Sequence, residues 1–326
     1  MRCRWFCPWG VALLVLFLLA LSSCDDGVSL KPRSSGEPYD VVVVANDVRV
    51  RTILSKMMET PLPGLPQQET AFDVSHAADA TALRSSRYAR AIVVVDIDAS
   101  RHSATRLRYE KDVYASPQMI VYLETPSADS LIADHDRVGR SLRALLGRFE
   151  TNNALRYLRK SHSPAREKEV LTTVDCRILV PSDLVKTKSG RRFIWLSDDG
   201  STTMRNICVY SAPGTDVSAE RLTALRDSVM QVNIKGETDA MYMTTERRVA
   251  PMVKTIRAGG RTIVEMRGLW QMQGDIMGGP FVSHTIVDTL RGRTITAEAF
   301  VYAPGEPKRN IIKRMEAALY TLSPSR

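Results

Sequence analysis

The chain has 326 residues, of which 25% are charged and 44% hydrophobic, and its formal net charge is +9. This composition is that of an ordinary globular protein and excludes a disordered or fibrous chain, while the length favours two domains. Only one dense apolar run occurs, near residue 11, which excludes a protein that crosses a membrane many times.

The first 23 residues have the pattern of an export signal. Arg2 and Arg4 precede an uncharged run at residues 11–21, which is shorter than the roughly 20 residues of a membrane-spanning helix. The next segment resembles the lipobox of bacterial lipoproteins and consists of Leu21, Ser22, Ser23 and Cys24. That resemblance implies cleavage before Cys24 and acylation of its thiol and its new amino group. The alternative is an uncleaved signal anchor with an incidental cysteine.

The residues after Cys24 bear on where the protein is held. Asp25-Asp26 resembles an inner-membrane retention signal of proteobacterial lipoproteins, but it also resembles a surface-export signal of Bacteroidetes lipoproteins. Residues 27–37 are rich in serine, glycine and proline, which is typical of a flexible tether. We therefore expect a lipid-anchored protein of the cell envelope, with membrane lipid as its partner through acylated Cys24.

The positive charge does not indicate a nucleic-acid partner. The predicted cleavage removes two arginines and lowers the net charge from +9 to +7. The densest basic clusters lie at residues 137–160, where leucines interleave with them as on a solvated helix face. No nucleic-acid-binding motif accompanies them, so we predict no nucleic-acid partner.

The first half of the chain alternates strands and helices. The β-branched run at residues 40–45 predicts a buried strand, and Asn46-Asp47 can cap a helix that continues to about residue 58. The prolines of residues 61–66 interrupt regular structure. Similar patterns predict strands at 71–74, 91–97, 107–114 and 119–123, a helix at 77–88, and a long helical region at 127–160 with a break near Gly147 or residues 151–153.

A polar stretch with a proline and no apolar periodicity, residues 161–169, predicts the boundary between two domains. Beyond it, short strands are predicted at residues 177–180, 193–196 and 206–210, and a helix from Ser218 to about residue 231. Two hairpins are predicted at 253–271 and 281–302, followed by an amphipathic helix at 307–322.

We therefore predict an α+β fold with two tandem α+β domains. The first half has a mixed sheet with helices, and the second has a largely antiparallel hairpin sheet with packed helices. The predicted organisation is a lipoprotein signal peptide at 1–23, the lipidated cysteine and a flexible tether at 24–38, an N-terminal domain at 39–160, a linker at 161–174 and a C-terminal domain at 175–326.

Two cysteines, Cys176 and Cys208, remain after the signal peptide and Cys24 are set aside. In an oxidising compartment they can form a disulfide, which would stabilise the fold by about 3–4 kcal/mol. Two buried free thiols are the alternative, since cysteine is often a small core residue.

No motif identifies a catalytic or metal site. The chain lacks a G-x-S-x-G elbow, and Ser283 and His284 are adjacent on a predicted strand, so their side chains point to opposite faces. The five histidines are scattered without metal-binding spacing, so we predict no metal and no cofactor. A serine from a distant part of the chain that meets His284 in the folded protein would form such a site, so this histidine stays a candidate.

Three further residues are candidates for a ligand or partner region. Asp96 and Asp98 share a face at the end of a buried strand, where α/β proteins often place functional groups, although strand-end capping is the simpler explanation. Trp270 lies in a stretch that also holds Met272 and Met277. An exposed loop of this kind would bind a partner or an apolar ligand, whereas a lid over the sheet is the alternative.

Several stretches resemble a family of uncharacterised Bacteroidetes lipoproteins that carry the domain DUF4837. The resemblance extends from about Tyr39 to the C-terminus and rests on the motifs PGLPQ at 63–67, ASPQ at 115–118, FIW at 193–195, GGPFVSH at 278–284, FVYAP at 300–304 and KR at 308–309. It implies an origin in Bacteroidetes and therefore the outer membrane, on its periplasmic or surface face. It supplies no catalytic residues.

These observations predict a lipid-anchored envelope protein that is non-enzymatic and binds an envelope protein partner or a ligand through its folded domains. The alternative is an envelope hydrolase whose site is assembled only in three dimensions. A pocket that gathers Asp96, Asp98 or His284 with a nucleophile would favour the hydrolase.

Overall fold

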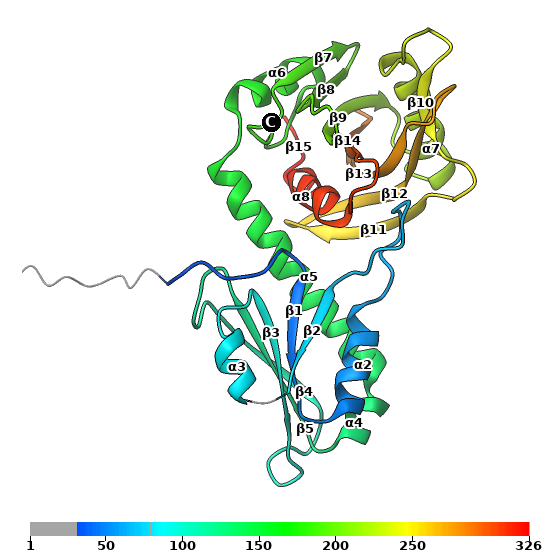
Figure 1. Cartoon of the computed structure of the whole chain (residues 1–326). Helices are drawn as coiled ribbons and strands as arrows, with labels where there is room; N and C mark the ends of the chain where they lie inside the picture. The colour runs from blue at the N-terminus through cyan, green and yellow to red at the C-terminus, as the bar shows by residue number, and fades with distance from the viewer. Residues whose placement is uncertain (1–30, 79, 326) are drawn as a thin grey trace, which may run out of the picture.

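The computed structural model describes residues 31–78 and 80–325, which form two units, each built on its own sheet (Figure 1). The first unit has a mixed sheet and the second a largely antiparallel one, so the predicted α+β class is confirmed. The predicted signal peptide lies outside the described residues, and so do all residues of the lipobox-like segment, Leu21, Ser22, Ser23 and Cys24. Within those residues, no helix is both long and apolar enough to span a membrane.

The sheet of the first unit has five strands, of which only the edge strand β4 is antiparallel. In spatial order they are β2 (Asp73–Ala77), β1 (Asp40–Val44), β3 (Ala91–Ile97), β5 (Met119–Thr125) and β4 (Arg106–Lys111). The β-branched runs of β1 and β3 lie in the interior of the sheet, as expected for strands that are covered on both faces.

Helices α2 (Val48–Met58), α4 (Ala128–Ala133) and α5 (His135–Lys160) cover one face of this sheet, and α3 (Ala80–Ser86) lies on the other (Figure 1). Helix α2 begins where Asp47 accepts hydrogen bonds from the backbone N–H groups of Arg49 and Val50. Helices α2 and α5 approach closely at Gly139, where a Cβ would lie 3.1 Å from Cγ of Met57.

The break that we predicted inside the long helical region is at the wrong place. The chain leaves α4 at Asp134 and then continues as one helix through Gly147 and residues 151–153. Gly147 has open space around it, so no neighbour forces the helix to bend there. Asn153 is buried in α5, and its Nδ2 has no hydrogen bond within the described residues.

The flexible tether that we predicted for residues 24–38 is wrong for its described part. Ser35 pairs with the backbone of Tyr88 and Arg90, and the carbonyl of Pro32 accepts a hydrogen bond from the N–H of Ser116. The segment therefore adds two isolated bridges beside the first sheet and is held to the folded unit.

The linker predicted at residues 161–174 is also wrong, because most of it is helix α6 (Pro164–Val174). Ser163 caps this helix and Pro164 occupies its first turn, a position that proline tolerates. Val170 and Val174 are buried in the core of the second unit. Two inward residues in eleven are too few to show a helical period against so polar a sequence.

The second unit contains an eight-stranded sheet that includes both predicted hairpins. Its strands are β7 (Lys186–Gly190), β8 (Phe193–Ser197), β9 (Met204–Pro213), β14 (Arg293–Tyr302), β13 (Gly278–Asp288), β12 (Arg261–Gln273), β10 (Tyr242–Thr245) and β11 (Met252–Ala258), the last two paired along different parts of β12. The strand predicted at 177–180 is reduced to β6 (Cys176–Arg177), which pairs with β15 (Ser323–Pro324).

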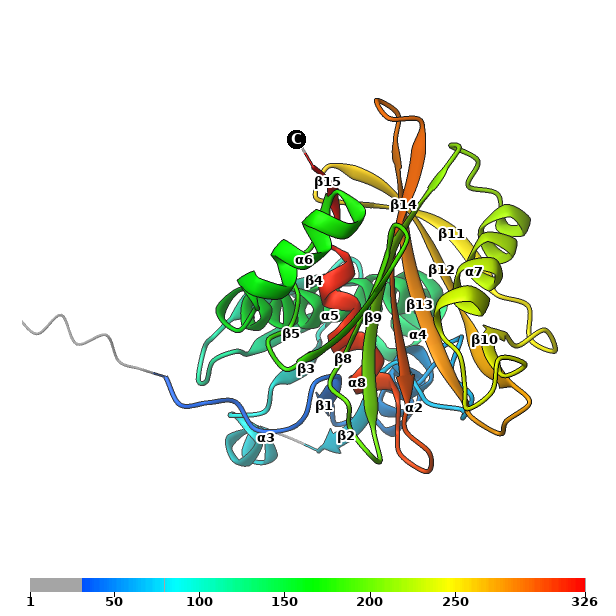
Figure 2. The ribbon, with the colours of Figure 1, turned by 90° about the horizontal axis from the view of Figure 1, so that it is seen from above.

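Both faces of the large sheet are covered by helices (Figure 2). Helices α6 and α8 (Arg309–Leu319) pack on one face, where Ile207 and Val209 of β9 join their core. Helix α7 (Ala219–Asn233) packs on the opposite face, where Cys208 and Tyr210 join a second core. The alternation along β9 shows that the sheet separates two apolar layers.

The two units are joined through α5, the loop at residues 61–70 and helix α8. Leu158, near the end of α5, belongs to the core of the second unit. Helix α8 has no capping side chain of its own, and Glu69 of the first unit accepts hydrogen bonds from the N–H groups of Lys308 (2.7 Å) and Arg309 (2.9 Å). The Arg309 guanidinium also forms a bidentate ion pair with Asp73. One unit therefore caps a helix of the other.

Candidate functional site

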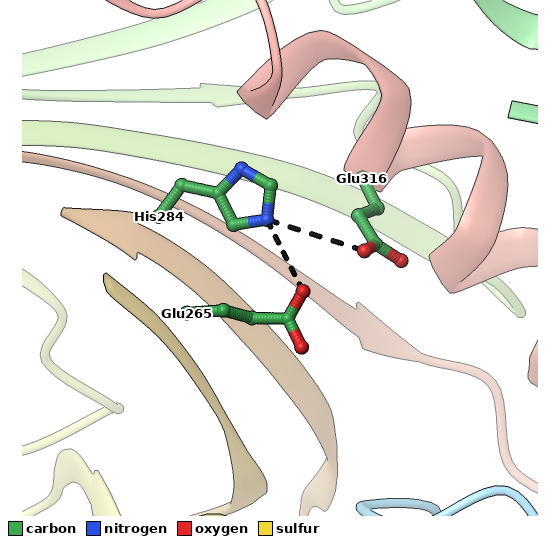
Figure 3. A group of neighbouring side chains, drawn as sticks. All are labelled: Glu265, His284 and Glu316. Carbon is green, nitrogen blue, oxygen red and sulfur yellow. Dashed lines mark ion pairs between the residues drawn. The ribbon is translucent and has the colours of Figure 1, made fainter. Parts of the chain in front are cut away.

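The described structure gathers ionisable side chains beneath helix α8, on the face of the large sheet that is turned toward it. Glu265 and Arg267 lie two residues apart on β12 and so share a face. His284 lies directly opposite Glu265 on β13, and Glu316 approaches from α8 (Figure 3). The side chains of these four residues are at most 9% exposed.

Arg267 is the centre of the hydrogen bonds in this cluster. Its Nε donates to Oε1 of Glu265 at 2.7 Å, and its Nη2 donates to Oε1 of Glu316. The hydroxyl of Tyr320, one turn further along α8, donates to the same oxygen of Glu316 at 3.1 Å. One guanidinium therefore fixes one oxygen of each carboxylate.

His284 is the residue of the cluster that has no hydrogen bond. Neither Nδ1 nor Nε2 has a partner, although the side chain is fully buried. Its Nε2 faces Oε2 of Glu265 at 3.6 Å and Oε1 of Glu316 at 4.0 Å (Figure 3). The ring packs edge-on against Tyr320, with 4.6 Å between centroids. A buried polar group without a partner is costly, so this orientation requires an explanation.

The charges in the cluster keep both carboxylates ionised. Burial by itself would raise the pKa of Glu265, but contact with His284 and the charge of Arg267 hold that pKa well below its ordinary value. Burial would likewise raise the pKa of Glu316, whereas the charges of Lys313 and Arg267 lower it. Burial and the neighbouring Glu316 raise the pKa of the Tyr320 hydroxyl, which therefore stays protonated.

The first unit contacts the part of β12 that carries this cluster. Gly64, in the loop between α2 and β2, lies so close to β12 that a Cβ would come within 3.2 Å of Cβ of Arg267. Gly64 has φ = +79°, a conformation that glycine adopts at little cost. Burial and the negative charge of Glu316 raise the pKa of Tyr39 of the first unit. The site thus lies at the junction of the two units.

Sequence reasoning selected only one member of the cluster, His284. Glu265 and Arg267 were missed because they lie in a strand with an otherwise ordinary pattern. Glu316 did carry a signal, because it lies four residues after Ile312 and three before Leu319 on the apolar face of the predicted helix. A carboxylate on an inward-facing stripe indicates a buried partner.

The structure places Asp96 and Asp98 elsewhere, at the carboxyl end of β3. Asp98 accepts hydrogen bonds from the backbone and hydroxyl of Ser100 and from Arg101, and these contacts hold its pKa well below the usual range. Asp96 pairs with Arg101 and His102. Both carboxylates are thus engaged within one short turn, as the capping alternative describes, and neither approaches His284.

Trp270 does not form an exposed loop. It is 3% exposed on β12, its Nε1 donates to the carbonyl of Val301, and its ring packs against Phe300 and Tyr302. The prediction of an exposed partner-binding tryptophan is therefore wrong. The residue lies under α7, because residues with even numbers on β12 face the core on that side.

Cys176 and Cys208 are buried free thiols, which is the second of the two alternatives that the sequence left open. Cys208 points into the core under α7, whereas Cys176 belongs to the core under α6 and α8, and the sheet lies between these cores. Burial raises the pKa of Cys176 to about 12 and also raises that of Cys208. Both thiols therefore stay protonated and unreactive at neutral pH.

A cavity of about 360 Å³ opens between α6 and the segment that follows it. Its lining is Pro164, Glu167, Lys168, Leu171, Arg177, Ile178, Leu179 and Thr321. Glu167 is already bound to His162 and to the N–H of Val180. Neither Lys168 nor Arg177 has an ion pair within residues 31–78 and 80–325. The cavity therefore offers two unpaired positive charges beside apolar side chains.

Two family models match the chain, one in each unit. Residues 163–321 match a family described as a domain of unknown function, DUF4837. The chain carries a DUF4837 domain. Residues 34–159 match a second family, the domain of unknown function DUF8532, so the DUF4837 match is shorter than the span from Tyr39 that the motifs indicated. No curated protein matches the chain.

The residues of the site can be assigned to the two matched domains. Glu265, Arg267, His284 and Glu316 all belong to the DUF4837 domain. The DUF8532 domain contributes Gly64, which lies close to Arg267. The same division assigns the cavity beside α6 to the DUF4837 domain.

Proposed function

We propose that this DUF4837 protein is a lipid-anchored protein of the cell envelope that binds a ligand or an envelope partner without catalysing a reaction. The observation that carries the proposal is the lipobox-like segment Leu21-Ser22-Ser23-Cys24, which follows a positively charged start and an uncharged apolar run. The predicted location is the outer membrane, on its periplasmic or surface face.

The cavity beside α6 supports a binding function. Lys168 and Arg177 offer unpaired positive charges at its edge, while Leu171 and Leu179 offer apolar contacts. This combination suits a ligand or peptide segment that carries both an anionic group and an apolar group. The hydrolase alternative has less support, because the cavity is not lined by Asp96, Asp98 or His284, and His284 is fully buried.

We expect the substitution Cys24→Ala to abolish lipid attachment. The precursor should accumulate unprocessed, because the thiol that carries the first acyl groups is missing. Metabolic labelling with a fatty acid, followed by fractionation of membranes, measures the effect. Ser22→Ala, which keeps a small residue before the cleavage site, is the control and should be processed normally. Unchanged labelling of the Cys24→Ala protein would refute the anchor.

The binding function is tested by crosslinking in cells. A photoreactive amino acid at Leu171, in the cavity, should give a specific adduct, because a bound partner would touch this position. The same amino acid at Val232, which is 70% exposed on α7, is the control. Equal adducts from both positions, or none from Leu171, would argue against the cavity as the binding surface.

A further inference from the structure

We propose that Glu265, His284 and Glu316 form a binding site for a divalent transition-metal ion. Each residue offers one ligand atom, and the three atoms lie within 4.8 Å of one another. A site with one imidazole and two carboxylates suits zinc and its neighbours in the periodic table, which accept mixed nitrogen and oxygen ligands.

The distances within the cluster fit a shared ion better than direct bonds. At 3.6 and 4.0 Å, the separations from His284 Nε2 to the two carboxylates exceed the length of a hydrogen bond. Two ligands that each lie about 2.1 Å from a zinc ion are about 3.4 Å apart at the tetrahedral angle, and about 4 Å apart when the angle opens toward 145°. The observed separations lie in or close to this range.

The orientation of His284 is an independent observation. Its side chain is fully buried, both ring nitrogens lack hydrogen bonds, and Nε2 points between the two carboxylates (Figure 3). Oε2 of Glu316 also has no hydrogen bond, although Nζ of Lys313 lies 3.1 Å from it as an ion pair. An ion held by these side chains would satisfy Nε2, which no protein group in the described structure does.

Arg267 binds one oxygen of each glutamate and leaves the other oxygen of each to an ion. It binds Oε1 of Glu265 and leaves Oε2 of that carboxylate to face His284. Groups that hold metal ligands in this way are a regular part of metal sites. On Glu316, Arg267 and Tyr320 both donate to Oε1, so Oε2 is the oxygen left for an ion. Lys254 pairs with Oε1 of Glu265 and Lys313 with Oε2 of Glu316, each at 3.1 Å. Their side chains are 59% and 21% exposed, so an ion at the site would displace the Lys313 ammonium group toward solvent.

The test is metal uptake by the purified full-length protein after dialysis against a chelator. We expect one equivalent of zinc to remain bound after desalting and to raise the melting temperature. His284→Gln should weaken binding more than about 100-fold, since it removes a ligand outright. His162→Gln, which changes a partly exposed histidine in the same domain, is the matched control and should bind zinc as the unmodified protein does.

Two further measurements keep the test decisive if His284→Gln does not fold. Tyr320→Phe retains the ring and removes only the hydroxyl that holds Glu316, so zinc affinity should fall about tenfold. Cobalt added to the unmodified protein should show the visible absorption of a four-coordinate site. No uptake of either metal by the unmodified protein, or equal zinc binding by the His284→Gln and His162→Gln proteins, would overturn the proposal.

Discussion

Replacing Arg226 with methionine is expected to cost about 3–5 kcal/mol of the free energy of unfolding. Arg226 of α7 is fully buried on the face of the large sheet opposite the proposed metal site. Its guanidinium forms a bidentate pair with Glu298, which is equally buried, donates to Thr245, and stacks 3.9 Å above the Phe281 ring. Methionine fills much of the volume but leaves the Glu298 carboxylate without its counterion.

The pH dependence of this variant follows from Glu298. Burial raises the pKa of Glu298 and the Arg226 charge opposes that rise, so removal of Arg226 should raise the pKa further. A carboxyl whose pKa is higher in the folded state than in the unfolded state loses stability as pH rises through the folded value. The cost of Arg226→Met should therefore be larger at neutral pH than near pH 5.

Urea unfolding, followed by tryptophan fluorescence, measures this effect. The double variant Arg226→Met with Glu298→Leu should recover most of the lost stability, because it leaves no unpaired charge in the core. If the double variant is as unstable as the single one, the cost comes from packing rather than from the buried charge.

Glu69→Ala is expected to loosen the junction between the two units and to lower stability by about 1–2 kcal/mol. Glu69 caps α8 from the other unit, and an uncapped helix end costs about this much. The loss should appear locally as faster amide exchange in the loop at residues 61–70 and at the start of α8.

Ser218→Ala is the matched control for this prediction. Ser218 caps α7 within its own domain, through the N–H of Arg221, so its loss should cost a similar stability without changing exchange in the 61–70 loop. Equal exchange in that loop for both variants would show that Glu69 does not hold the two units together.

Much of the fold could be predicted from local patterns. The hairpins formed by β11 to β14 follow from alternating residues about glycine turns, and β1 and β3 from their β-branched runs. Strand β7 was missed because its sequence, KTKSG, is polar and exposed at the edge of the sheet. Strand β10 was missed because four residues are too few to show a period.

The candidate site was far less accessible to sequence reasoning. Glu265 and His284 meet through the register of two strands, and Glu316 reaches them from a helix packed on that sheet. The register of these strands and the packing of the helix on them depend on the whole core, so no short motif predicts them. The choice between a disulfide and two free thiols stayed open for the same reason, because only the sheet shows that Cys176 and Cys208 lie in different layers.

Helix α5 limits the kinds of binding that this molecule can perform. Proteins that close two lobes around a ligand need a crossing segment that bends. Here the crossing is made by the last turns of a 26-residue helix whose Leu142 lies in one core and whose Leu158 lies in the other. A rotation of one domain against the other would therefore bend α5 between these residues or pull one of them out of its core. We expect the two domains to move together, so that a partner of the kind proposed above docks on a preformed surface.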